Sequence, residues 1–96
     1  MTTIDAIKTL RSNILAARQA VADIEAQGLP AAERSRAITK AGPRGYVDVT
    51  RAIEADPSGV SEEILDAAWE AAESCSGMGW RSSAAVKHFV TLTESL

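Results

Sequence analysis

The sequence predicts an all-α protein, a small helical bundle of four to five helices in a single helical domain over residues 1–96. Two observations lead to this expectation. Apolar residues recur at helical spacing in most segments, and alanine, the strongest helix former, occurs 18 times. Helix caps and turn formers also divide the chain into lengths that suit short helices. A chain of 96 residues can build one modest core and is too short for two.

The first helix is expected over about residues 3–27. Thr2 or Thr3 can cap its start, and Gly28 before Leu29 and Pro30 predicts its end. Its apolar positions recur every seven residues in two interleaved series, as in an a/d pattern. The pattern predicts a stripe buried inside a bundle, with the seam of a homodimer as the alternative. The residues of this stripe that could form an oligomer seam are Ile7, Leu10, Ile14, Val21 and Ile24.

Two weaker helices are expected next. Residues 30–41 begin with a proline, which the first turn tolerates, and Gly42 with Pro43 ends the segment. Residues 46–55 fit a helical face, although 46–50 also have strand propensity. An alternative α+β fold would contain a short two-stranded element near 46–50 and 89–93. Residues 56–59, Asp-Pro-Ser-Gly, predict a turn.

Two further helices are predicted in the second half of the chain. Ser61 is a suitable N-cap for a helix over residues 62–74, and the Gly-Met-Gly sequence at 77–79 interrupts the chain after it. Ser82 or Ser83 can cap a last helix. The expected apolar face of that helix consists of Ala85, Phe89, Leu92 and Leu96.

The segment 62–74 separates an apolar arc from a row of carboxylates. On a helical wheel, the arc consists of Ile64, Leu65, Ala68, Ala72 and Cys75. The opposite side holds what we call the acidic row, which consists of Glu62, Glu63, Asp66, Glu70 and Glu73. Trp69 falls at the boundary. Like charges at this spacing repel each other, and no Lys or Arg lies between residues 52 and 80. The row is either a solvated face or a docking surface for a basic protein, with Trp69 as an apolar anchor.

Basic residues gather in a different part of the chain, which we call the basic segment. It covers residues 34–51 and contains Arg34, Arg36, Lys40, Arg44 and Arg51. The simplest expectation is that these cations neutralise the acidic row within the chain. Direct nucleic-acid binding is not expected, because the segment offers no interleaved platform of aromatic residues and the whole chain has a net charge of −3.

The residues that most often carry catalysis or metals are scarce. A single cysteine and a single histidine, Cys75 and His88, exclude an intramolecular disulfide and most zinc sites. Cys75 lies in the apolar arc, where an inert packed thiol is expected. The sequence therefore predicts no enzyme, no cofactor and no metal. It contains no membrane-spanning run and no secretory signal, so we expect a cytoplasmic protein.

Taken as a whole, this small, acidic, helical chain without catalytic residues resembles the inhibitors that phages and mobile elements encode, notably anti-CRISPR proteins. The resemblance implies a non-enzymatic protein-binding inhibitor or adaptor that blocks a nucleic-acid-binding complex. Its partner would be a protein with a basic surface, bound through the acidic row and Trp69. Two alternatives remain, namely a small DNA-binding regulator that uses the basic segment and a structural protein that multimerises through the first helix.

Overall fold

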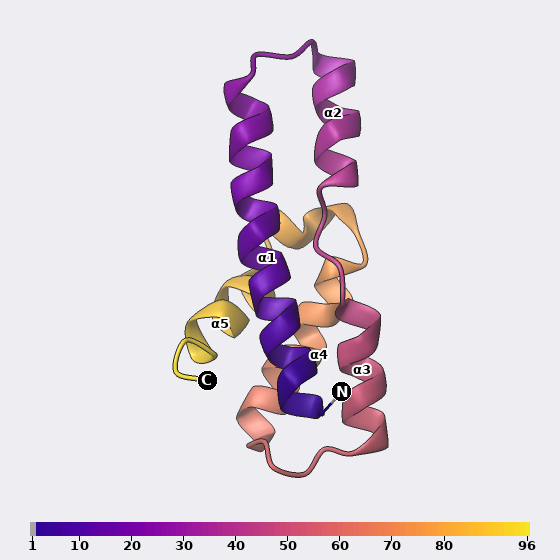
Figure 1. The fold of residues 1–96 in the computed structure, drawn as a ribbon, viewed down its shortest axis with the longest axis vertical. Helices are drawn as coiled ribbons and strands as arrows, with labels where there is room; N and C mark the ends of the chain where they lie inside the picture. The colour runs from indigo at the N-terminus through magenta and orange to yellow at the C-terminus, as the bar shows by residue number, and fades with distance from the viewer. Residues whose placement is uncertain (1) are drawn as a thin grey trace.

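The computed structural model describes residues 2–96, which form five α-helices and one short 3-10 helix (Figure 1). The α-helices are α1 (Thr3–Ala26), α2 (Ala31–Lys40), α3 (Tyr46–Ala55), α4 (Glu62–Cys75) and α5 (Ala84–Leu92), and the 3-10 helix η1 is Met78–Arg81. The described residues contain no strand, so the predicted all-α bundle is confirmed. The α+β alternative is wrong, because residues 46–50 begin α3 and residues 89–92 end α5.

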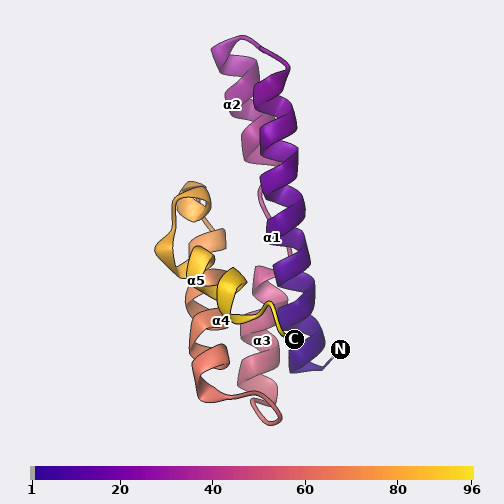
Figure 2. The same cartoon turned by 90° about the vertical axis from the view of Figure 1, so that its left-hand side faces the viewer.

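The long helix α1 is the spine of the molecule. Its C-terminal half pairs with the antiparallel α2, and α3 continues from α2 beside its N-terminal half (Figure 1). The view turned by 90° shows α4 and α5 together on one side of the lower part of α1 (Figure 2). The N-terminal half of α1 forms a four-helix body with α3, α4 and α5. The C-terminal half of α1 forms a hairpin with α2 that projects from this body, and the molecule measures 47 × 22 × 20 Å.

Most of the predicted helix ends are confirmed by hydrogen bonds. The hydroxyl of Thr2 accepts from the backbone N–H of Asp5 at 3.2 Å, and the hydroxyl of Ser61 accepts from that of Ile64 at 3.4 Å. Ser83 caps α5 in the same way. Gly28, with φ of 66°, follows α1 in the left-handed conformation that glycine adopts most easily.

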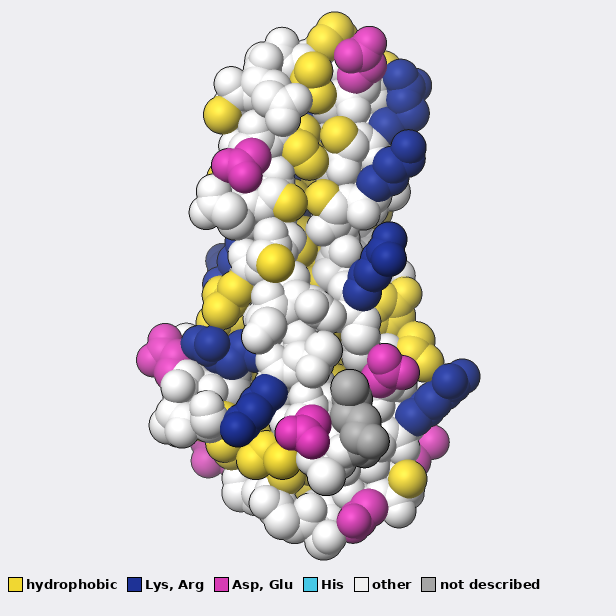
Figure 3. Space-filling view, viewed as in Figure 1, with side chains coloured by type: hydrophobic (Ala, Val, Ile, Leu, Met, Phe, Trp, Pro, Cys, Tyr) yellow, Lys and Arg dark blue, Asp and Glu magenta, His cyan; other side chains and the backbone are white. Residues whose placement is uncertain are grey.

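The α1–α2 hairpin is thin. No residue of α2 is buried, and only Ile38 of that helix packs against the core. Hydrophobic side chains line the seam between the two helices and remain visible from outside (Figure 3). A pair of helices without a third neighbour cannot enclose its apolar contacts, so the hairpin has little burial to stabilise it.

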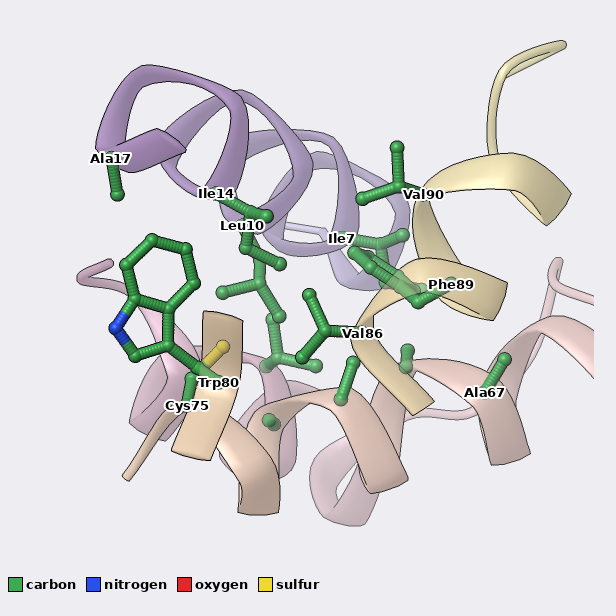
Figure 4. Packing of buried hydrophobic residues seen from close by; sticks show 14 of the residues in the cluster. Ile7, Leu10, Ile14, Ala17, Ala67, Cys75, Trp80, Val86, Phe89 and Val90 are labelled. Carbon is green, nitrogen blue, oxygen red and sulfur yellow. The ribbon is translucent and has the colours of Figure 1, made fainter. Parts of the chain in front are cut away.

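The core lies between α1 and the layer of α4 and α5. Ile7, Leu10 and Ile14 point from α1 toward that layer (Figure 4) and have no exposed surface. Val21 is buried too, whereas Ile24 is half-buried. Four of the five candidate seam residues are thus covered inside the chain, as expected for a bundle. A dimer through them would require the protein to open.

Two predicted apolar faces differ from the observed ones. In α4 the buried residues are Ala67, Ala68, Ala71, Ala72 and Cys75, while Ile64 and Leu65 are half-buried. This helix packs against α3 and α5 on two sides, and alanines allow both to approach closely.

The buried face of α5 is rotated from the predicted one. It consists of Val86, Phe89 and Val90, followed by the buried Thr93. Ala85 and Leu92 are half-buried, and Leu96 is exposed because the helix ends at Leu92. Thr93 can be buried because its hydroxyl donates a 2.6 Å hydrogen bond to the carbonyl oxygen of Phe89.

Candidate functional site

The acidic row lies on the exposed side of α4. Its five carboxylate residues are all exposed, and the buried alanines occupy the opposite side of the same helix. Glu62 and Glu63 stand in the first turn, where the helix dipole favours negative charge. The fold therefore presents the row as one continuous surface, as the periodicity predicted.

Trp69 is half-buried on α4. Asp66 precedes it by three positions and Glu73 follows it by four, so the indole adjoins both carboxylates on the helix surface. Trp69 does not belong to the hydrophobic cluster of the core. The helix thus provides apolar surface directly beside the acidic row.

Neither charged surface contains an ion pair among the residues that the structure describes. Among residues 2–96, one ion pair forms, between Arg81 and Glu25, with 2.7 Å between the guanidinium nitrogen and the carboxylate oxygen. Neither residue belongs to the acidic row or the basic segment. The expectation that the two surfaces form ion pairs with each other is therefore wrong for the described residues. Arg34 and Arg36 lie on α2, which extends beyond the body (Figure 1). Arg51 lies on α3, which packs against α4, whereas the row occupies the exposed side of α4.

The five cations of the basic segment are all exposed. Arg34, Arg36 and Lys40 lie on α2, Arg44 lies in the linker to α3, and Arg51 lies on α3. Lys and Arg side chains form a column along the α2 side of the molecule (Figure 3). The molecule is therefore electrically asymmetric, with a basic hairpin and an acidic helix in the body.

Cys75 is buried, and burial raises the pKa of its thiol to about 11. A thiol with so high a pKa is a poor nucleophile at neutral pH. His88 is exposed on α5. No group of three or more His, Cys, Asp and Glu residues within 2–96 is arranged to hold a metal ion. No helix in this part of the chain has the length and apolarity needed to cross a membrane.

A further candidate site, which the sequence patterns did not predict, lies beside the linker of residues 41–45. We call it the linker pocket. Its volume is about 350 Å³, and it lies between that linker, the start of α3 and the segment from the end of α4 through η1. Its lining residues include Lys40, Arg44, Tyr46, Met78 and Trp80. The two sides of this pocket are about 35 residues apart in the sequence, so no local pattern could have brought them together.

Comparison of the chain with models of protein families, with curated proteins and with solved structures found no match. Function is therefore inferred from the geometry and charge of the acidic row, the basic segment and the linker pocket.

Proposed function

We propose that this protein is a non-enzymatic protein-binding inhibitor or adaptor that places the acidic row of α4 in a basic groove of a nucleic-acid-binding complex, as anti-CRISPR proteins do. One observation carries the proposal. The five carboxylates of the row share one exposed helix face, and none of them forms an ion pair within residues 2–96. Repulsion between like charges at this spacing costs a few tenths of a kcal/mol for each pair, and a basic partner would relieve it.

The charge density of the row limits how strongly it can attract a basic groove. From Glu62 to Glu73 the helix rises about 17 Å at 1.5 Å per residue. Duplex DNA carries about ten phosphate charges over the same length, whereas the row carries five carboxylates. Electrostatic attraction would speed and orient the encounter, but exposed charge pairs contribute little affinity. Affinity therefore also requires an apolar anchor, for which Trp69 is the candidate.

The proposed site of action is the cytoplasm. Nucleic-acid-binding complexes of the kind proposed as targets work there, and a single buried thiol is compatible with a reducing compartment. The protein would act by occupancy alone, without a cofactor and without binding nucleic acid itself.

The test measures inhibition of DNA binding in a panel of RNA-guided effector complexes, by fluorescence anisotropy of labelled target DNA. We expect stoichiometric inhibition of at least one complex. The variant Glu62→Gln, Asp66→Gln, Glu70→Gln, Glu73→Gln removes four charges from the row while keeping residues that favour helix. Inhibition by this variant should fall at least about tenfold, which corresponds to about 1.4 kcal/mol.

A matched control removes the same amount of charge elsewhere. The exposed residues Glu33, Asp48, Glu54 and Glu94 lie outside the row and can be changed together, Asp48 to Asn and the others to Gln. This control should inhibit as the wild type does. An equal loss in both quadruple variants would show that only the net charge matters, and unchanged inhibition by the row variant would remove the acidic row as the binding surface.

The DNA-binding alternative is tested by a gel shift with random duplex DNA. We expect no shift at physiological salt, because the basic segment supplies five cations on a chain that is acidic overall. A shift that disappears in the double variant Arg34→Gln, Arg36→Gln would instead assign the function to the basic segment.

A further inference from the structure

The linker pocket has an unused hydrogen-bond donor in its wall. Trp80 is 4% exposed, and its indole Nε1 donates no hydrogen bond within residues 2–96. A Cβ placed on Gly42, which also lines the pocket, would lie 3.8 Å from Nε1. The ring sits at the edge of the core with its nitrogen turned away from Leu10 and Val86 (Figure 4). Nε1 does not belong to the buried atoms that lack a partner, so this atom is open to solvent at the pocket that Trp80 lines. An indole N–H at such a place usually donates to an acceptor, which a ligand can supply.

The charged residues that line the pocket all have one sign. Lys40 and Arg44 line it, both are exposed, and neither forms an ion pair in the described part of the chain. No Asp or Glu belongs to the lining. The pocket also borders the start of α3, whose N-cap, Gly45, supplies no side-chain hydrogen bond to the first turn. The positive end of the α3 dipole adds to the two cations, and Asp48, which stands in the same first turn but does not line the pocket, offsets part of it.

The end of α4 also borders the pocket, and helix C-termini repel anions. Two of its terminal carbonyl oxygens already have partners, however. The backbone N–H and the hydroxyl of Ser76 both donate to the carbonyl oxygen of Glu73, and the N–H of Gly77 donates to that of Ser74. These bonds reduce the negative potential that α4 presents to the pocket.

Apolar side chains form part of the remaining wall. Met78 is 61% exposed, and the hydroxyl of Thr39 approaches its sulfur at 3.7 Å. This contact joins α2 to η1 across the pocket, so the thioether lies beside the opening. Tyr46 and Pro43 supply further apolar surface. Adaptable methionine and aromatic surface of this kind suits an apolar group of a ligand.

From these features we propose that the linker pocket binds a small organic anion, a carboxylate or phosphate group attached to an apolar body. The anionic group accepts hydrogen bonds from Trp80 Nε1 and pairs with Arg44 and Lys40. The apolar body packs against Met78 and Tyr46. The volume of about 350 Å³ is within the usual range for small-molecule sites. This inference does not rest on the function proposed for the acidic row.

The test follows the two indole N–H signals in a ¹H–¹⁵N NMR spectrum of the full chain, with assignment from a Trp69→Phe variant. Phenyl phosphate and phenylacetate are the anionic probes, and they distinguish a phosphate site from a carboxylate site. Benzyl alcohol is the neutral probe, and inorganic phosphate is the anion without an apolar body. We expect a saturable shift of the Trp80 signal with at least one aromatic anion and an unchanged Trp69 signal. Benzyl alcohol should bind at least about tenfold more weakly, as loss of a charge-assisted hydrogen bond implies.

Variants of two arginines then test which cation binds the anionic group. Arg44→Gln should weaken binding of the better anion about tenfold, while Arg44→Lys keeps the charge and should weaken it less. Arg34→Gln is the matched control, because Arg34 belongs to the basic segment but does not line the pocket. It should bind as the wild type does. The proposal is overturned if no anionic probe shifts Trp80, if benzyl alcohol binds equally well, or if Arg34→Gln and Arg44→Gln lose the same amount.

Discussion

The side-chain amide of Asn13 donates a 2.8 Å hydrogen bond to the carbonyl oxygen of Arg44 and so ties the linker to the middle of α1. The next residue, Gly45, has φ of 90°, and a Cβ at that position would lie 3.1 Å from the same amide nitrogen. The turn from the linker into α3 therefore depends on glycine for two reasons, its backbone conformation and the space that Asn13 occupies.

Gly45→Ala should therefore destabilise the protein more than Gly59→Ala does. Both glycines have positive φ, but a Cβ on Gly59 would meet nothing within 4 Å. We expect the Gly59 variant to lose about 1 kcal/mol from the backbone conformation alone. The Gly45 variant should lose about 2 kcal/mol, because the hydrogen bond from Asn13 is disturbed as well. Urea denaturation measures both, and equal losses would contradict the role given to Asn13.

The stripe on α1 can be tested with two adjacent residues. Ile14 has no exposed surface, whereas Leu15 is 38% exposed. Ile14→Ala should lower the free energy of unfolding by about 2 to 4 kcal/mol, because it leaves a cavity between α1 and the opposite layer. Leu15→Ala should cost less than about 1 kcal/mol. Similar losses in the two variants would mean that the core does not lie where the periodicity and the structure place it.

Most of the fold could be predicted because its signals are local. Caps such as Ser61 and stops such as Gly28 define helix ends through hydrogen bonds and backbone angles within a few residues. The buried face of α5 could not be read in the same way. Its rotation toward Val86 and Val90 follows from contact with α4, and alanine-rich helices allow several packing angles.

The candidate sites also differ in whether local sequence spacing or tertiary structure brings their residues together. The acidic row was predictable because helical spacing alone places its carboxylates on one face of α4. The linker pocket was not, because Trp80 reaches Gly42 only when η1 folds back beside the linker. The expected pairing of opposite charges could not be checked from spacing along the chain, because whether two side chains meet depends on the tertiary structure, and none of the row carboxylates pairs with a cation among residues 2–96.

The thinness of the hairpin predicts uneven stability along the chain. Amide hydrogens of α2 should exchange with solvent much faster than those of α4, because α2 buries no residue and α4 buries five. Hydrogen–deuterium exchange with mass spectrometry measures both helices in one experiment. Equal protection of α2 and α4 would indicate that something covers the hairpin in solution, such as a second copy of the chain.

The burial of Cys75 predicts a loss of stability at alkaline pH. The pKa of its thiol rises from a usual 9.0 to about 11, because burial disfavours the thiolate. Above pH 9 the unfolded chain releases this proton while the folded chain keeps it, so the free energy of unfolding falls as pH rises toward 11. A Cys75→Ala variant isolates the contribution of the thiol. Urea denaturation from pH 8 to 10.5 should give a shallower decline in that variant. Parallel declines in both proteins would show that the folded chain leaves the thiol free to ionise.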